Sequence, residues 1–138
     1  MPVALCIEAP KQIVNRSCVD AVAIPKGTLC KLSGSSINTV NAATGTGEAF
    51  GGITVEEKTV SDGIVNIGCA LDGVWDIQNS SAAASAIGTI VVMSGANLYR
   101  AAVAADLLTG AVVGSLEELG TASGVDRVRL RIIPAIRA

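Results

Sequence analysis

The sequence predicts an all-β fold, a small barrel or sandwich built from two similar β units. Three observations predict it: the apolar runs are short, turn residues bound them, and the second half of the chain repeats the first. Half of the 138 residues are apolar, which suffices for the core of one domain. Because Phe50, Trp75 and Tyr99 are its only aromatic residues, we expect neighbouring subunits to supply part of its stability.

The repeat is expected to relate residues 27–71 to residues 88–132 at a constant offset of 61, without gaps. Glycines, apolar positions and an acidic pair stay in register: Gly27-Thr28-Leu29 with Gly88-Thr89-Ile90, Leu32-Ser33-Gly34 with Met93-Ser94-Gly95, Val55-Glu56-Glu57 with Leu116-Glu117-Glu118, and Gly63-Ile64 with Gly124-Val125. Self-similarity at a fixed period indicates a duplicated supersecondary unit whose copies pack on each other. We therefore expect residues 23–138 to form a single β domain.

The apolar runs predict nine strands, because Gly, Asp and Ser separate these runs and Asp72-Gly73 is a strong hairpin signal. In chain order, the predicted strands are Thr28–Leu32, Ile37–Asn41, Ala49–Thr54, Ile64–Leu71, Val74–Ile77, Gly88–Met93, Asn97–Val103, Ala111–Leu116 and Asp126–Ile133.

Residues 1–22 lie outside the repeat and predict an N-terminal arm or an edge strand, divided by Pro10. Such a segment is free to reach a neighbouring molecule and add a strand to it. Lys11 and Arg16 in this segment are candidate interaction residues. We expect a chain without residues 1–12 to fold and to bind its partner less tightly.

The last predicted strand alternates, with Val128 and Leu130 on one face and Arg127, Arg129 and Arg131 on the other. This basic ladder is a candidate contact for an acidic protein surface, and a solvated edge strand is the alternative. Nucleic acid is disfavoured, because the total charge is −2 and aromatic residues are few. Trp75, the lone tryptophan, is a candidate either for capping the core or for anchoring an interface.

The amino-acid composition excludes most of the common catalytic arrangements. The absence of histidine excludes Ser-His-Asp and Cys-His arrangements, and no P-loop motif occurs. The pairs Glu56-Glu57 and Glu117-Glu118 are read as solvated turn residues, since neighbours in a strand point to opposite faces. We therefore expect no enzymatic activity, no cofactor and no metal.

The sequence predicts neither a membrane span nor a secretory signal, since no apolar run reaches about 18 residues and the N-terminus lacks a basic region. The ends of the chain are basic and residues 48–76 are acidic, which suits electrostatic matching between neighbours. Four cysteines, Cys6, Cys18, Cys30 and Cys69, are expected to be mostly buried, reduced thiols, although their pairing stays open.

Five segments of the chain resemble the small capsid cement, or head decoration, proteins of tailed bacteriophages. They are Ile24-Pro25-Lys26-Gly27-Thr28-Leu29, Phe50-Gly51-Gly52-Ile53-Thr54-Val55, Gly63-Ile64-Val65-Asn66-Ile67-Gly68-Cys69-Ala70-Leu71-Asp72-Gly73-Val74, Gly88-Thr89-Ile90-Val91-Val92 and Val125-Asp126-Arg127-Val128-Arg129-Leu130. The resemblance covers roughly residues 20–133. The chain departs from the family in its first 20 residues, in its cysteines and in its tail Ile133–Ala138.

The resemblance implies a compact β-barrel-like domain, often a homotrimer, made in the host cytoplasm and placed on the outer surface of the capsid. Its partner would be the major capsid protein, which it would stabilise against the pressure of packaged DNA. Two alternatives stay open: another virion subunit, such as a tail or head-fibre component, and a small trimeric β enzyme that acts on nucleotides.

Overall fold

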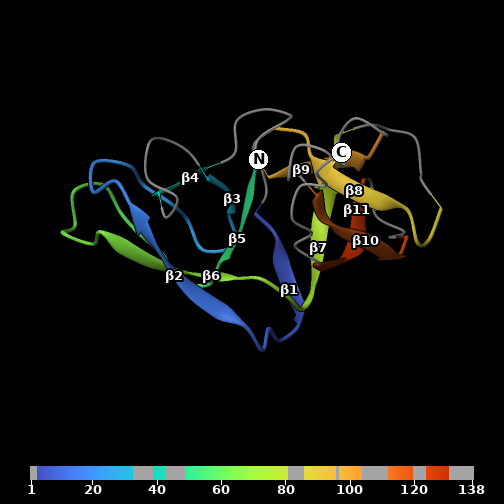
Figure 1. The fold of residues 1–138 in the computed structure, drawn as a ribbon, viewed down its shortest axis with the longest axis horizontal. Helices are drawn as coiled ribbons and strands as arrows, with labels where there is room; N and C mark the ends of the chain where they lie inside the picture. The colour runs from blue at the N-terminus through green and yellow to red at the C-terminus, as the bar shows by residue number, and fades with distance from the viewer. Residues whose placement is uncertain are drawn as a thin grey trace, which may run out of the picture.

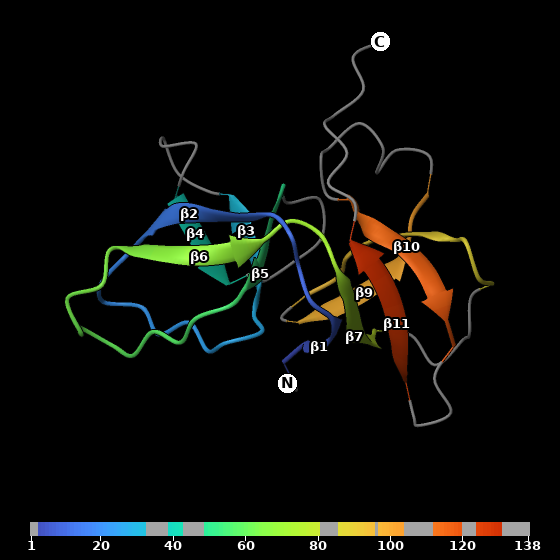
Figure 2. The same ribbon diagram turned by 90° about the horizontal axis from the view of Figure 1, so that it is seen from below.

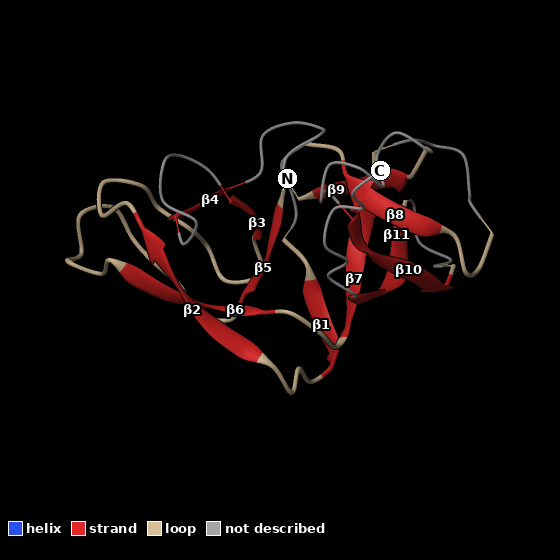
Figure 3. Cartoon of the chain, in the orientation of Figure 1, coloured by secondary structure: helices blue, strands red, loops and turns tan. Residues whose placement is uncertain are grey.

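A computed structural model of the chain describes residues 3–32, 39–42, 49–80, 86–95, 97–103, 112–119 and 124–130. Every regular element in these residues is a β-strand, which confirms the predicted all-β class (Figure 3). All nine predicted strands are present, with ends that differ from the prediction by a few residues. Two further strands come from the N-terminal segment.

The strands form two units that lie side by side (Figures 1 and 2). The strands of the first unit are β2 (Ile13–Cys18), β3 (Leu29–Leu32), β4 (Thr39–Ala42), β5 (Phe50–Thr54) and β6 (Asn66–Ala70). They close into a barrel in the order β2-β4-β3-β5-β6.

The second unit is one sheet of six strands. These strands are β1 (Leu5–Glu8), β7 (Val74–Asn79), β8 (Ile90–Met93), β9 (Leu98–Ala101), β10 (Val112–Glu118) and β11 (Val125–Leu130). Their order is β1-β7-β11-β10-β8-β9, and the sheet curls until β7 also pairs with β9. A parallel pairing of β7 with β9 thus mirrors the parallel pairing of β2 with β4 in the first unit.

The two units share one topology, as the repeat predicts. Every pairing within the first barrel has a counterpart of the same direction in the second sheet. By register, β2 corresponds to β7 and β3 to β8 at an offset of 61 residues. The offset becomes 62 for β5 and β10, and 59 both for β4 and β9 and for β6 and β11.

The expected gapless register is therefore wrong, because the loops between strands differ in length while the pairing pattern stays the same. Leu116 occupies the place of Thr54 rather than that of Val55, and Val128 occupies the place of Cys69. Loops on a surface tolerate such insertions far better than a paired strand does.

The N-terminal segment forms two paired strands of the fold and is not a free arm. β2 pairs with β4 and β6 inside the first barrel, so the predicted boundary at residue 22 is wrong for residues 13–18. β1 is an edge strand on β7, and Pro10 lies between β1 and β2. The sequence of β2, with Asn15, Arg16 and Ser17 in succession, lacks the alternation that would have revealed a barrel strand.

One hydrophobic core spans both units. Its members are buried residues from the first unit, from the second unit and from the N-terminal segment: Leu29, Phe50, Ile53 and Ala70; Trp75, Ile77, Val91, Met93, Tyr99, Val113, Leu116, Val128 and Leu130; and Ala4. A smaller cluster fills the first barrel and contains Cys18, Ile24, Cys30, Ile67 and Cys69. Burial of a common core makes the two units one folding domain.

Two polar contacts reinforce the junction between the units. The N–H of Leu29 in β3 donates to Asn97 Oδ1, which precedes β9, at 3.0 Å. The N–H of Ala4 donates to the carbonyl of Gly27 at 2.8 Å, so the segment that leads into β1 is tied to the first unit while β1 itself pairs with the second.

Gly27 and Gly88 provide a matched test of this N-terminal contact. They hold equivalent positions with φ of 86° and 88°, but a Cβ on Gly27 would lie 2.5 Å from the carbonyl oxygen of Ala4, whereas a Cβ on Gly88 would meet nothing within 4 Å. Gly88→Ala should lower the free energy of unfolding by roughly 1–2 kcal/mol through backbone strain alone. Gly27→Ala should cost about 1–3 kcal/mol more, because the N-terminal segment must move.

Urea unfolding followed by the fluorescence of the buried Trp75 measures both variants. Equal losses for the two substitutions would show that the contact between Ala4 and Gly27 contributes nothing to stability.

Candidate functional site

The arginine ladder on β11 is neutralised within the second unit. Arg127 Nε lies 3.1 Å from Asp76 Oδ1, and its Nη1 lies 3.4 Å from Glu118 Oε2. Arg129 Nε lies 2.7 Å from Glu117 Oε1. β11 runs between β7 and β10, so the alternative of a solvated edge strand is wrong. The charges of this face are thus paired across neighbouring strands.

The predicted alternation of β11 is confirmed over Arg127–Leu130, whose arginines are partly exposed and whose apolar residues are buried. Arg131 lies outside the described residues. Asp126, which precedes the ladder, faces inward and is 8% exposed. Its carboxylate accepts a hydrogen bond from the hydroxyl of Tyr99, and burial together with this bond raises the pKa of Tyr99.

Trp75 belongs to the core rather than to an exposed interface. Its side chain is 3% exposed and packs in the cluster that spans both units. The indole Nε1–H donates to the carbonyl of Asp72 at 3.1 Å, which satisfies its one polar atom. Of the two roles that the sequence left open, the structure therefore supports that of a core residue.

Lys11 and Arg16 lie in different surroundings. The side chain of Lys11 is exposed at the junction and lines a groove of about 200 Å³ together with Glu8, Asp72 and Arg129. Arg16 extends over the first barrel, where its Nε donates to the carbonyl of Gly51 at 3.2 Å. The groove brings Lys11 and Arg129 together, but charges of both signs line it.

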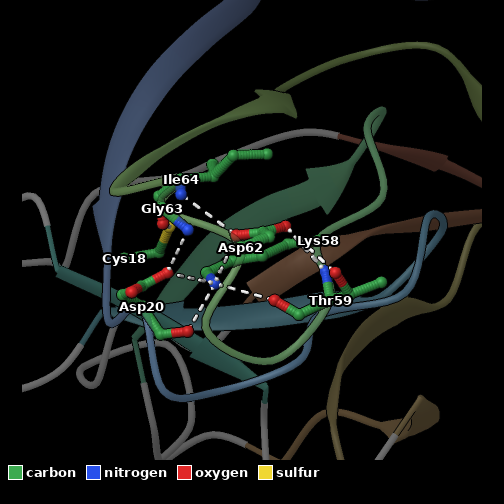
Figure 4. Close-up of polar contacts among 7 residues, drawn as sticks. All are labelled: Cys18, Asp20, Lys58, Thr59, Asp62, Gly63 and Ile64. Atoms are coloured by element: carbon green, nitrogen blue, oxygen red, sulfur yellow. Dashed lines mark hydrogen bonds and ion pairs between the residues drawn. The ribbon is translucent and has the colours of Figure 1, made fainter.

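The most completely enclosed charge in the described residues is Lys58, which the sequence did not single out. Its side chain is 0% exposed, and its Nζ lies 3.1 Å from Asp62 Oδ1 and 3.4 Å from Asp20 Oδ1. The same Nζ donates to the carbonyls of Asp20 at 2.7 Å and Thr59 at 3.1 Å. Figure 4 shows the ammonium group between the two aspartates and these carbonyls. An enclosed lysine needs such a set of acceptors, because an unpaired buried charge is costly.

The two aspartates extend this network into the backbone of both loops. Asp20 Oδ1 accepts the N–H of Gly63 at 2.8 Å, and Asp62 accepts the N–H groups of Ile64 at 3.0 Å and Thr59 at 2.9 Å. Loops 19–25 and 55–65 are also joined through the paired backbone of Ile24 and Lys58. The ion pairs and hydrogen bonds of Lys58 therefore hold loop 19–25 against loop 55–65.

The pKa values of Asp62 and Lys58 are shifted by the contacts that these two residues make. The N–H of Ile64 and the ammonium of Lys58 lower the pKa of Asp62 from 3.8 to about 2. Burial pulls the pKa of Lys58 down, but its hydrogen bonds to Asp62 and Asp20 outweigh burial and leave that pKa above its usual value. Asp62 and Lys58 are thus both charged at neutral pH.

The two loops that the Lys58 network joins carry several exposed aliphatic side chains. The two locked loops form the end of the first unit that points away from the second (Figure 1). Their exposed aliphatic residues are Val19, Val22, Val60, Ile64 and Val65, which we call the aliphatic tip. Exposed aliphatic residues that gather in one place mark interaction sites on soluble proteins.

All four cysteines are free, and three of them are buried, in agreement with the sequence-based expectation for those three. Cys6 on β1 is exposed. A hydrogen bond to Cys69 and burial raise the pKa of Cys30, so it is a neutral thiol that packs as a small apolar residue.

Among the residues that the structure describes, no group of three or more potential metal ligands occurs. The same part of the chain forms no helix with the length and apolar character that a membrane crossing requires. No protein-family model matches the chain. No curated protein is similar enough to match it either.

Replacing Lys58 by Met tests the lock between the two loops. Lys58→Met keeps the length of the side chain but leaves Asp20 and Asp62 without their cation, so the melting temperature should fall and the amides of Gly63 and Ile64 should exchange faster with solvent. Lys26→Met is the control, because the side chain of Lys26 is exposed. If both variants lose the same stability, Lys58 does not hold the loops together.

Asp62→Asn tests the pH dependence of this network. Because the folded pKa of about 2 lies below the usual 3.8, the ionised carboxylate stabilises the fold fully above about pH 5. That contribution is lost as the pH falls through 3.8 toward 2. The difference in unfolding midpoint between the wild type and Asp62→Asn should therefore shrink over this range in urea titrations. A difference that stays constant down to about pH 2 would contradict the assignment.

Proposed function

We propose that this protein is a structural virion protein that binds the outer surface of a tailed-phage capsid and stabilises it. The segments that resemble the cement family include much of β5, β6, β8 and β11, which are central to the two units. The β-barrel architecture agrees with what that resemblance implies. The partner in this proposal is the major capsid protein, and the working form is a homo-oligomer, with a trimer favoured.

The observation that carries the proposal is the aliphatic tip and the way it is held. Val60 and Val65 are 62% and 54% exposed, yet their loops are fixed by an enclosed ion network rather than left loose. A pre-organised surface loses little conformational entropy on binding, so its apolar burial contributes more fully to affinity. Such a surface suits attachment to another protein, and we assign that attachment to the capsid shell.

The ion pairs among the described residues also suit a structural role. Arg127, Arg129 and Lys58 all lie in ion pairs inside the chain. Paired groups of this kind stiffen a shape and are not poised for acid–base chemistry. We therefore propose a role without catalysis, in which stiffness resists expansion of the shell.

Val60→Asp and Val103→Asp form a matched test of attachment. The two valines are 62% and 61% exposed, but Val60 belongs to the aliphatic tip and Val103 follows β9 in the second unit. A carboxylate at the centre of an apolar contact must be desolvated, so Val60→Asp should weaken binding to purified expanded heads of the cognate phage by about tenfold or more. Val103→Asp should bind within about twofold of the wild type.

Co-sedimentation with the heads measures the affinity, and the rupture temperature of decorated particles measures stabilisation. If the wild-type protein does not bind the heads, the cement role is wrong. If both variants bind equally well, the aliphatic tip is not the attachment surface.

A further inference from the structure

β2 and β7 hold equivalent places in the two units, but their second edges have equivalent partners over only part of their length. β2 pairs with β6 as β7 pairs with β11, and the far ends of β2 and β7 pair with β4 and β9. In the second unit β1 covers the rest of that edge, with Leu5 opposite Asp76 and Glu8 opposite Val74. In the first unit, none of the strands in the described part of the chain covers the equivalent edge at Ile13–Asn15.

The backbone of β2 shows which groups face this open edge. Cys18 directs its N–H toward the β6 side, where it donates at 2.9 Å to the residue before β6. Gln12 directs its carbonyl to the same side and accepts at 3.0 Å from the residue after β6. Because successive residues of a strand face opposite edges, Ile13 and Asn15 direct their N–H and C=O groups to the open edge. The equivalent groups of Val74 and Asp76 face β1.

Side-chain exposure differs between the equivalent positions on the covered and the open edge. Ile13 and Val74 occupy the same place at the start of β2 and β7. Val74, beside β1, is 4% exposed, whereas Ile13 is 51% exposed. An added strand would remove apolar surface of Ile13 from water and would pair the exposed backbone groups.

We propose that the edge of β2 at Ile13–Asn15 is a strand-addition site for an extended segment of a partner protein, one that carries apolar side chains and a carboxylate. β1 is the pattern for this segment, since it binds the equivalent edge with the sequence Leu5-Cys6-Ile7-Glu8. Glu8 stands opposite Val74, so the matching carboxylate would stand opposite Ile13, which follows the exposed Lys11 closely in the sequence.

Charge complementarity favours such an acidic segment over a basic one. In the second unit the carboxylate of Glu8 pairs with Arg129 at 3.5 Å. In the first unit the exposed Lys11 precedes the open edge and supplies a positive charge. The incoming strand would run antiparallel to β2, as β1 runs antiparallel to β7.

This site goes beyond attachment to a shell, because it specifies a peptide and its orientation, and its test needs no capsid. The probe is an acetylated peptide with the sequence of residues 3–9 and Ser in place of Cys6, added to the full-length protein. Amide chemical shifts and hydrogen exchange of Ile13 and Asn15 report binding. We expect saturable shifts and slower exchange at these two residues, with little change at Val74, whose edge is already covered by β1.

Asn15→Pro and Asn15→Ala form the matched pair of variants. Both remove the side chain, but only proline removes the N–H that faces the open edge, and the ladder with β6 does not use that N–H. Asn15→Ala should bind the peptide within about twofold of the wild type, and Asn15→Pro should bind it at least about tenfold more weakly. Lys11→Glu, which leaves the backbone unchanged, should also weaken binding and should do so less at high salt.

Three results would overturn the proposal. The first is an absence of shifts at Ile13 and Asn15 with about 1 mM peptide. The second is equal binding by the proline and alanine variants, or, if Asn15→Pro does not fold, unchanged binding by Lys11→Glu. The third is a set of shifts centred on Val74, which would show that the peptide displaces β1 instead.

Discussion

Each unit depends on one long-range antiparallel pairing, of β2 with β6 in the first unit and of β7 with β11 in the second. These antiparallel ladders bring together segments about 50 residues apart in the sequence and help to close each set of strands into a ring. The parallel pairings of β2 with β4 and of β7 with β9 then leave few open edges in the described strands. The same ladders place Arg127 of β11 beside Asp76 of β7, so the charge pattern of the surface also follows from ring closure.

Duplication preserved the pairing pattern while the interiors of the units diverged. Cys18 and Ile67 of the first barrel correspond to Asn79 and Asp126 of the second unit. The first interior is therefore lined by thiols and aliphatic groups. In the second interior the buried carboxylate of Asp126 accepts a hydrogen bond from the hydroxyl of Tyr99. A buried carboxylate requires such a partner, which ties β9 to β11 and makes that interior less tolerant of substitution.

Two surfaces of the first unit have no counterpart of the same kind among the described residues of the second. The aliphatic tip rests on loops that the enclosed Lys58 joins, and the open edge of β2 lacks the strand that β1 provides to β7. They lie at opposite ends of β2, one beyond Cys18 and the other at Ile13. A partner that contacts both would lie along the length of this strand and would fix the orientation of the protein.

The sequence by itself determined the all-β class, the duplication and most strand positions, because apolar alternation and glycine-bounded turns are local signals. The in-register glycines, such as Gly27 and Gly88, were visible for the same reason. Tertiary structure decided the rest. β2 escaped detection because its polar sequence folds into a barrel only through pairing with β6, about 50 residues later. The enclosure of Lys58 and the ion pairs of Arg129 likewise arise from residues that only folding brings together, and a lysine in a sequence ordinarily indicates a solvated side chain.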